Sequence, residues 1–425
     1  MIYHLAFTIC ILGLTIFNYY IGRKNVMYPP FLYSAIWLAV LSLYFLLLIV
    51  PIIEMPVLGV YTLFLVLSGT AGFTAGGLVM RSQRFAHPLI EAEPKNSMIK
   101  KVLLFCVIAL LPFYYMAIRS LSAAGGLDGF LMSARAALVD RLNSGESGFG
   151  GPLSTIGPTF SVFVAFIFLI EARNLRKERV WFWTSTLIAV SFCILTTGRA
   201  GFLKLLVGLA GIYVLKTGRY SAREAWKLIR WPVVAFLVLF TILIPITKVD
   251  SDKVDLPQSI AQYSVGYAVL PLAGFDYVVH HPDEYKYQGN HTFAELVPMW
   301  QVLSGSHLPP LPAAPGDFLM VPLFANVYTV FNPYYLDFGL TGVVFVMFLF
   351  GAGQSWLFWR AMKGAPFYIF LYAISLYPLS MVAFDNTYTL FAHYLIEFLF
   401  AVVYCKVLRR IPIRVDSVEL ASPQP

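Results

Sequence analysis

The residues best suited to chemistry in this sequence lie at a short turn between two apolar runs. The turn at 196–201 reads TTGRAG and joins runs at 180–196 and 200–216, each slightly short for a full bilayer. Such a hairpin can place its turn below the membrane surface, in a cavity lined by protein. The turn also begins a helix, whose free N–H groups and positive dipole end favour an anion. We therefore expect an anion to bind here.

Two basic side chains accompany this turn. Arg199 presents a planar fork of donors that matches phosphate oxygens, and Lys204 lies about one turn further along the same run. A charge at that depth is costly unless it is used. We therefore expect Arg199 and Lys204 to contact a phosphate group. The alternative is that Arg199 only reaches the membrane surface, or pairs with an acid such as Asp276.

Two further arginines are candidate phosphate contacts in an outer loop at 119–152. We expect a short helix over 130–142 in this loop, near the membrane interface. Arg135 and Arg141 are six residues apart, so at about 100° per residue they point to different faces. Arg135 is the one we favour. Arg141 stands near the helix end, where it can complement the helix dipole instead.

A long and polar stretch at 248–337 holds the residues that can accept a proton. Histidine titrates near neutral pH, and burial can raise the pKa of a carboxyl group into the same range. The candidates are His280, His281, His291, Asp276 and Asp337. We favour His291 and Asp276 as the catalytic base. His291 can instead cap a short helix, and Asp337 is more readily interpreted as the cap of the next apolar run.

The same stretch is rich in side chains that suit sugars. Aromatic rings pack against the C–H faces of a sugar, and amide and carboxylate groups hydrogen-bond its hydroxyls. The candidate sugar contacts are Asn326, Tyr328, Tyr334, Tyr335 and Asp337. Tyrosine at a membrane surface also serves as an interface anchor, which is the plainer explanation for part of this set.

Composition identifies the elements that must position these residues. Hydrophobic residues make up 59% of the 425 residues and charged residues only 12%, and the mean hydropathy is +0.74. Soluble domains carry about 25% charged residues, so the chain is expected to be an all-α integral membrane protein with many spans. A net charge of +8 could indicate a nucleic-acid-binding protein, but the placement of the basic residues argues against this function.

Eleven apolar runs are long enough to be spans. They lie at about 2–21, 28–50, 57–80, 102–118, 153–170, 180–196, 200–216, 231–247, 338–359, 366–384 and 387–405. With the N-terminus outside and the C-terminus inside, the inner segments hold 22 of the 30 lysines and arginines. The positive charge is therefore a topology signal. We predict one membrane domain, 1–425, with a smaller outer loop at 119–152 and a large one at 248–337.

The chain resembles the O-antigen polymerase (Wzy) family of oligosaccharide repeat-unit polymerases. Three features carry the resemblance: about a dozen spans with one dominant outer loop, the TGRAG turn at 197–201, and the stretch 326–342. That last stretch begins NVYT and continues as YYLDFGLTG into the next span. The resemblance covers most of the chain, although its motifs are short, and it carries no information on the sugar.

The resemblance implies a GT-C-like membrane glycosyltransferase of the bacterial inner membrane, with its active site facing the periplasm. Donor and acceptor would be undecaprenyl-pyrophosphate-linked oligosaccharides, and the donor glycan would move onto the terminal sugar of a new repeat unit. Arg199 and Arg135 would neutralise the departing pyrophosphate. No metal or other cofactor is expected, because the acids at 250–252 stand without further candidate ligands. Membrane lipids and a chain-length regulator of the Wzz type are the expected partners, with no nucleic acid.

Two other functions fit the same pattern. An O-antigen ligase uses the same donor but transfers the glycan to lipid A-core. A transporter or flippase of lipid-linked oligosaccharides belongs to a different class. The transporter is disfavoured because the chain shows no inverted repeat of hydropathy and places its polar residues in outer loops.

Overall fold

The computed structural model describes most of the membrane-like part of the chain. It covers 1–50, 53–81, 98–121, 152–172, 178–196, 199–218, 256–282 and 327–408 except 390, with short pieces within 221–230 and 291–325. These residues form α1 (Ile2–Ile21), α2 (Pro29–Ile49), α3 (Val60–Arg81), α4 (Met98–Leu121), α6 (Pro152–Glu171), α7 (Arg179–Leu195), α8 (Arg199–Thr217), α10 (Leu256–His280), α13 (Asn332–Ala361), α14 (Pro366–Met381) and α15 (Phe391–Val402). A 3₁₀ turn, η1 (Thr387–Thr389), precedes α15, and a π-helical turn, η2 (Val403–Val407), follows it.

Six of these helices are long and apolar enough to cross a membrane: α1, α2, α3, α4, α8 and α13. Shorter apolar helices accompany them, namely α7, α14 and the C-terminal parts of α6 and α10. Helices coincide with ten of the eleven predicted spans. The eleventh, at 231–247, lies outside the described residues, as does the helix expected at 130–142. The described fold is thus that of a multi-pass helical membrane protein.

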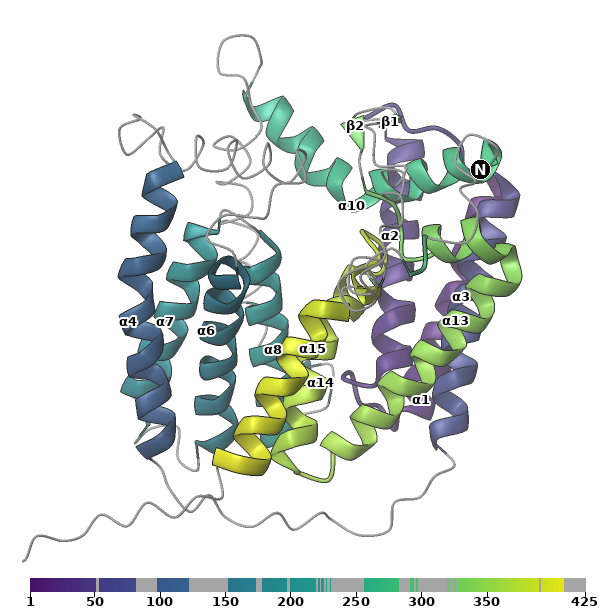
Figure 1. Cartoon of the computed structure of the whole chain (residues 1–425). Helices are drawn as coiled ribbons and strands as arrows, with labels where there is room; N and C mark the ends of the chain where they lie inside the picture. Colours follow the sequence, from purple (N-terminus) through teal and green to yellow (C-terminus); the bar gives the residue numbers. More distant parts are fainter. Residues whose placement is uncertain are drawn as a thin grey trace, which may run out of the picture.

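The helices form two groups joined by a central pair (Figure 1). One group contains α1, α2, α3 and α13, which pack on one another, and the other contains α4, α6, α7 and α8. Helix α14 lies between them and contacts both, through α2 and α13 on one side and α6 and α8 on the other. Helix α15 packs against α14 and α6. The two groups therefore meet along α14 and α15.

Glycines allow α3 and α13 to pack closely. A Cβ atom on Gly76 would lie 2.0 Å from the Phe348 carbonyl oxygen, and one on Gly351 would lie 2.0 Å from the Phe73 carbonyl oxygen. Small residues at such crossings bring helix backbones together, which is a common way of packing helices in membranes. The ring of Phe73 then stacks on Tyr33 of α2, at 4.1 Å between centroids. This contact forms the aromatic core of the first helix group.

The stretch 248–337 contains more regular structure than a loop. Helix α10 occupies its first part, with Pro271 inside the helix, and packs against α2 and α3. Two short antiparallel strands, β1 (Leu319–Met320) and β2 (Phe324–Ala325), form a hairpin further on. Helix α13 then begins six residues before the span predicted at 338–359. Its backbone breaks at Gly339, where φ is +63°, so the predicted boundary marks this kink.

Candidate functional site

The turn between α7 and α8 begins a helix, as predicted. Arg199 is the first residue of α8, and α7 ends at Leu195, four residues earlier. The structure describes the backbone of Arg199 but not its side chain, and 197–198 lie outside the described residues. The free N–H groups of the first turn of α8 therefore lie at the position expected for an anion.

A buried group of three titratable side chains lies behind this helix start. The Lys204 ammonium of α8 forms an ion pair with the Glu397 carboxylate of α15. His393 stands one turn before Glu397 on α15, with its Nε2 at 2.8 Å from Lys204 Nζ and at 3.1 Å from Glu397 Oε1. We call these residues the Lys204–His393–Glu397 cluster. The cluster ties α8 to α15 at the boundary between the two helix groups.

The cluster differs from a surface ion pair in its burial. The side chains of Lys204 and Glu397 are only 8% and 4% exposed, whereas that of His393 is 29% exposed. The Lys204 ammonium also lies 5.8 Å from the ring centroid of Tyr377 in α14. Charges held in such a place are costly without a partner, and they mark functional positions more often than chance.

Sequence reasoning found Lys204 but not its partners. Glu397 is the single acid within the predicted span 387–405, and His393 precedes it by four residues. An acid and a histidine one helical turn apart inside an apolar run would have been a sufficient signal. In the structure the Lys204 ammonium is paired with the Glu397 carboxylate. A contact between Lys204 and a phosphate group remains a prediction.

Asp385 follows α14 and lies close to the same region. Burial raises the pKa of the Asp385 carboxyl to about 6, although a hydrogen bond from the Asn386 N–H, 2.7 Å from Asp385 Oδ1, acts in the opposite direction. The carboxylate also interacts electrostatically with Tyr377, whose ring lies beside Lys204. Asp385 is therefore a proton-binding group at the end of the cluster.

Replacing Asp385 with asparagine should stabilise the protein at neutral pH. The pKa of about 6 in the folded protein exceeds the ordinary value of 3.8, so stability is fully present below 3.8 and falls as the pH rises to 6. The corresponding loss is about 3 kcal/mol at pH 7 and about half of that at pH 5. Thermal midpoints in detergent should therefore differ more between Asp385→Asn and the parent protein at pH 7 than at pH 5. An equal difference at both pH values would contradict this assignment.

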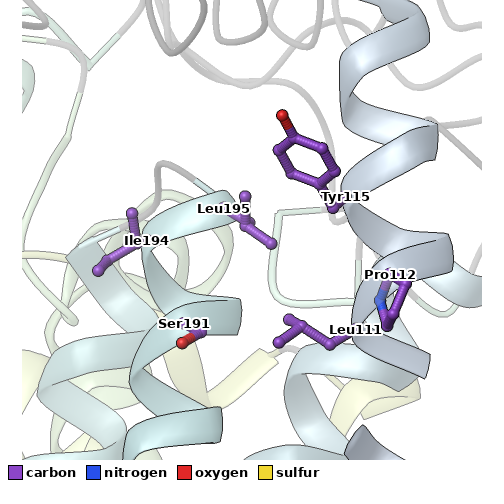
Figure 2. A pocket seen from close by; sticks show the side chains of 6 residues that line it. All are labelled: Leu111, Pro112, Tyr115, Ser191, Ile194 and Leu195. Carbon is purple, nitrogen blue, oxygen red and sulfur yellow. The ribbon is translucent and has the colours of Figure 1, made fainter. Parts of the chain in front are cut away.

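An apolar cleft opens next to the α7–α8 turn (Figure 2). Its volume is about 400 Å³, and it lies between α4 and α7. The lining residues are Leu111, Pro112, Tyr115, Ser191, Ile194 and Leu195. Pro112 lies inside α4, and Ile194 and Leu195 end α7, so the cleft lies within five residues of Arg199 along the chain. A cleft with this lining suits a hydrocarbon chain.

Asp276, one of the two predicted bases, belongs to α10, and its side chain contacts the start of α3. Its Oδ1 accepts a hydrogen bond from the Gly59 N–H at 2.9 Å, directly before the first residue of that helix. His280, one turn further along α10, has its Nδ1 at 3.6 Å from the same oxygen. A Cβ atom on Gly59 would lie 2.4 Å from His280 Cε1, so a larger residue there would displace the His280 ring. Asp276 thus holds α10 against the start of α3.

His291, the other predicted base, is tied to α13 through Asp337. The backbone N–H groups of His291 and Thr292 donate to Asp337 Oδ1 and Oδ2 at 3.3 and 2.7 Å. Asp337 lies inside α13, five residues after its first residue, and its carboxylate connects the outer stretch to this helix. His281, an alternative base, stacks on Tyr277 at 4.2 Å between ring centroids.

The predicted sugar contacts occupy different environments. Tyr334 is buried and donates its hydroxyl to Asn386 Oδ1 at 3.0 Å, while Tyr335 packs edge-on against Phe275 and Tyr61. Tyr328 is buried beside Gly274 of α10. Asn326, Arg135 and Arg141 lie outside the described residues. Among the residues that are described, no three His, Cys, Asp or Glu side chains gather closely enough to hold a metal ion.

The structure separates the two predicted bases from the predicted anion site. Helix α10 ends, and α13 begins, on the side of α1, α2 and α3, near the N-terminus (Figure 1). Helix α8 begins on the other side, where it packs with α6, α7 and α14. His291 and Asp276 therefore lie with one helix group, and Lys204 with the other. His393 is the histidine that the structure brings to Lys204.

The arrangement offers the start of a helix to an anion and an apolar cleft beside it to a hydrocarbon chain. No family model matches this sequence, and neither the comparison with curated proteins nor the comparison with solved structures finds a similar protein.

Proposed function

We propose that the chain is a metal-independent membrane glycosyltransferase that polymerises undecaprenyl-pyrophosphate-linked oligosaccharide repeat units. The product would be O-antigen or a related surface polysaccharide. The observation that carries the proposal is the Lys204–His393–Glu397 cluster, buried behind the helix start that Arg199 opens. Ionisable side chains inside apolar helices are costly, and they commonly mark the site at which a membrane protein acts.

The parts of a lipid-linked donor match the parts of this region. The apolar cleft between α4 and α7 would take isoprene units of the lipid, since its lining is almost entirely hydrocarbon. The pyrophosphate would lie at the first turn of α8, where Arg199 and the free N–H groups favour an anion. Because Leu195 of the cleft and Arg199 are four residues apart, one lipid can reach both.

The proposed reaction joins the acceptor sugar to the donor glycan at its anomeric carbon. An acceptor hydroxyl attacks this carbon, and the lipid pyrophosphate departs into the positive region at the start of α8. The anomeric carbon is bonded to the pyrophosphate, so the base must lie within a few ångströms of the anion. His291 and Asp276 were predicted for this role, but they lie with the other helix group. The proposal therefore does not rest on these two residues.

The membrane placement follows the distribution of basic residues. In this proposal the N-terminus and the start of α8 face the periplasm, and the C-terminus faces the cytoplasm. Lipid-linked repeat units are then met on the periplasmic side of the bacterial inner membrane, where a chain-length regulator of the Wzz type would also act. The GT-C-like architecture inferred from the family resemblance belongs to this same proposal.

Deletion of the gene, scored on a lipopolysaccharide gel, tests the proposal. A polymerase deletion should leave core carrying a single repeat unit in place of the ladder of long chains. Bare core would indicate a ligase or a flippase instead. Adding purified protein to synthetic lipid-linked repeat units then separates an enzyme from a transporter, because only the polymerase lengthens the glycan without a second compartment.

A further inference from the structure

Two neighbouring basic residues follow α1 in a backbone conformation that residues with a side chain rarely adopt. Arg23 and Lys24 have φ angles of +57° and +60°, and no other non-glycine residue has a positive φ in the part of the chain that the structure describes. This left-handed conformation is strained for an L-residue, and turns normally place glycine or asparagine there. Strain that persists at two adjacent residues indicates that their side chains serve a purpose.

The turn that contains these residues is held against the end of α13. Asn25 Nδ2 lies 3.7 Å from the sulfur of Met362, which directly follows α13. The ring of Tyr28 packs against Trp359, at 6.1 Å between centroids. A Cβ atom on Gly77 of α3 would lie 3.1 Å from the Tyr28 hydroxyl. The ends of α1, α3 and α13 therefore meet at one surface, at the end of the first helix group opposite the N-terminus.

This surface is basic and has no acid from the helices that form it. We call it the inner basic surface, and its basic residues are Arg23, Lys24, Arg81, Arg360 and Lys363. Arg23, Lys24 and Arg81 are exposed, Arg81 acts electrostatically on Tyr28, and the charges of Arg360 and Lys363 repel each other. Helices α1, α2, α3 and α14 contain no Asp or Glu, and the single acid of α13 lies near its opposite end. The surface thus favours an anion.

Aromatic side chains place the inner basic surface at the depth of lipid headgroups. The rings of Trp356 and Tyr368 each lie with their centroid 5.7 Å from the Arg360 guanidinium carbon. The Tyr20 ring centroid lies 5.9 Å from Lys24 Nζ. Tryptophan and tyrosine concentrate at the membrane–water interface, where the phosphate groups of lipids lie. The rings also orient the Arg360 guanidinium, whose planar fork matches phosphate oxygens.

We infer that the inner basic surface binds the phosphate headgroup of an anionic phospholipid in the adjacent leaflet. In the orientation predicted from the basic residues, this leaflet faces the cytoplasm. The general excess of basic residues on that side explains where the charges lie, but not why two of them occupy left-handed positions. The inference is independent of the reaction proposed above, because it concerns the opposite end of the helices.

Replacement of the strained pair by glycine tests the inference without loss of the fold. Arg23→Gly/Lys24→Gly removes both charges, and glycine adopts the left-handed conformation without strain, so the thermal midpoint without lipid should equal or exceed that of the parent protein. Phosphatidylglycerol is titrated onto each purified protein in uncharged detergent, with phosphatidylcholine as the reference, and bound lipid is counted by native mass spectrometry. We expect the parent protein to prefer phosphatidylglycerol and the double variant to bind it about 30-fold more weakly.

A matched pair of glutamine variants separates this surface from a general charge effect. Arg360→Gln/Lys363→Gln removes two charges from the inner basic surface and should weaken phosphatidylglycerol binding in the same way. Lys101→Gln/Arg179→Gln removes two charges at the starts of α4 and α7, in the other helix group, and should bind like the parent protein. An equal loss in both glutamine variants would overturn the inference.

Three further results would also contradict a lipid site. They are equal binding of the two lipids by the parent protein, parent-like binding by Arg23→Gly/Lys24→Gly, and equal protection by a soluble headgroup. For the last comparison, glycerol phosphate is added at the concentrations at which phosphatidylglycerol raises the thermal midpoint. We expect no rise, because the soluble compound lacks the acyl chains that hold the headgroup at the membrane surface.

Discussion

Arg199→Lys is expected to slow glycan polymerisation by about 30- to 1000-fold without lowering the amount of protein in the membrane. Lysine keeps the positive charge at the start of α8 but loses the planar fork that binds two phosphate oxygens at once. The loss of one or two charge-assisted hydrogen bonds to the leaving group corresponds to about 2–4 kcal/mol in the activation free energy. The rate is measured with purified protein and synthetic lipid-linked repeat units.

Arg179→Lys is the matched control for this substitution. Arg179 is an exposed arginine that begins α7, at the opposite end of that helix from the α7–α8 turn. It should tolerate lysine with little change in rate, because it lies a full helix length from the proposed anion. Normal chain length in a well-expressed Arg199→Ala protein would show that Arg199 has only a structural role. A similar loss in both lysine variants would indicate a general effect of membrane packing.

The helices were predictable because the membrane imposes a simple rule on sequence. A segment that crosses the bilayer must satisfy its backbone internally and expose apolar side chains, so about 20 apolar residues predict a helix. The first span was predicted at 2–21, and α1 occupies Ile2–Ile21. The boundary at 338 was also informative, since it coincides with the kink at Gly339. The helix itself begins earlier because residues 332–338 are already helical ahead of this kink.

Helix α10 was not predicted, because its apolar part is too short and its N-terminal part too polar for a membrane span. Its N-terminal part is polar, and Pro271 interrupts the apolar part, so neither half reaches the length of a span. No pattern in the sequence indicates a helix that packs across α2 and α3. Such a helix is stabilised by tertiary contacts, among them the Asp276–Gly59 hydrogen bond, and these contacts are not visible in one sequence.

The candidate site was only partly predictable, because it joins residues nearly 200 positions apart. Residue type and depth singled out Lys204, and those properties are local. Its pairing with Glu397 depends on how α8 and α15 meet at α14, which no local pattern specifies. His291 and Asp276 were favoured because they stand in a polar outer stretch. In the structure these two residues lie with the other helix group and not beside α8.

The second large effect concerns stability and is expected for Lys204→Met. This change leaves the Glu397 carboxylate buried without its ammonium partner, and breaking a buried pair in this way costs about 3–5 kcal/mol. We expect a clear fall in the thermal midpoint in detergent and a lower steady-state level in the membrane. The double variant Lys204→Met/Glu397→Leu removes both charges and should recover much of the lost stability, because no unpaired charge remains.

A second ion pair in the same protein provides the control. Lys100 of α4 pairs with Glu178 at 2.5 Å; the Lys100 side chain is only 6% exposed, but that of Glu178 is 29% exposed, so water can solvate the carboxylate once the lysine is removed. Lys100→Met should therefore cost less stability than Lys204→Met, which leaves a fully buried carboxylate unpaired. Equal losses for Lys100→Met and Lys204→Met would contradict the burial of the Lys204–Glu397 pair. A stable double variant that fails to polymerise would show instead that the pair serves the reaction as well as the fold, since stability and activity would then be lost separately.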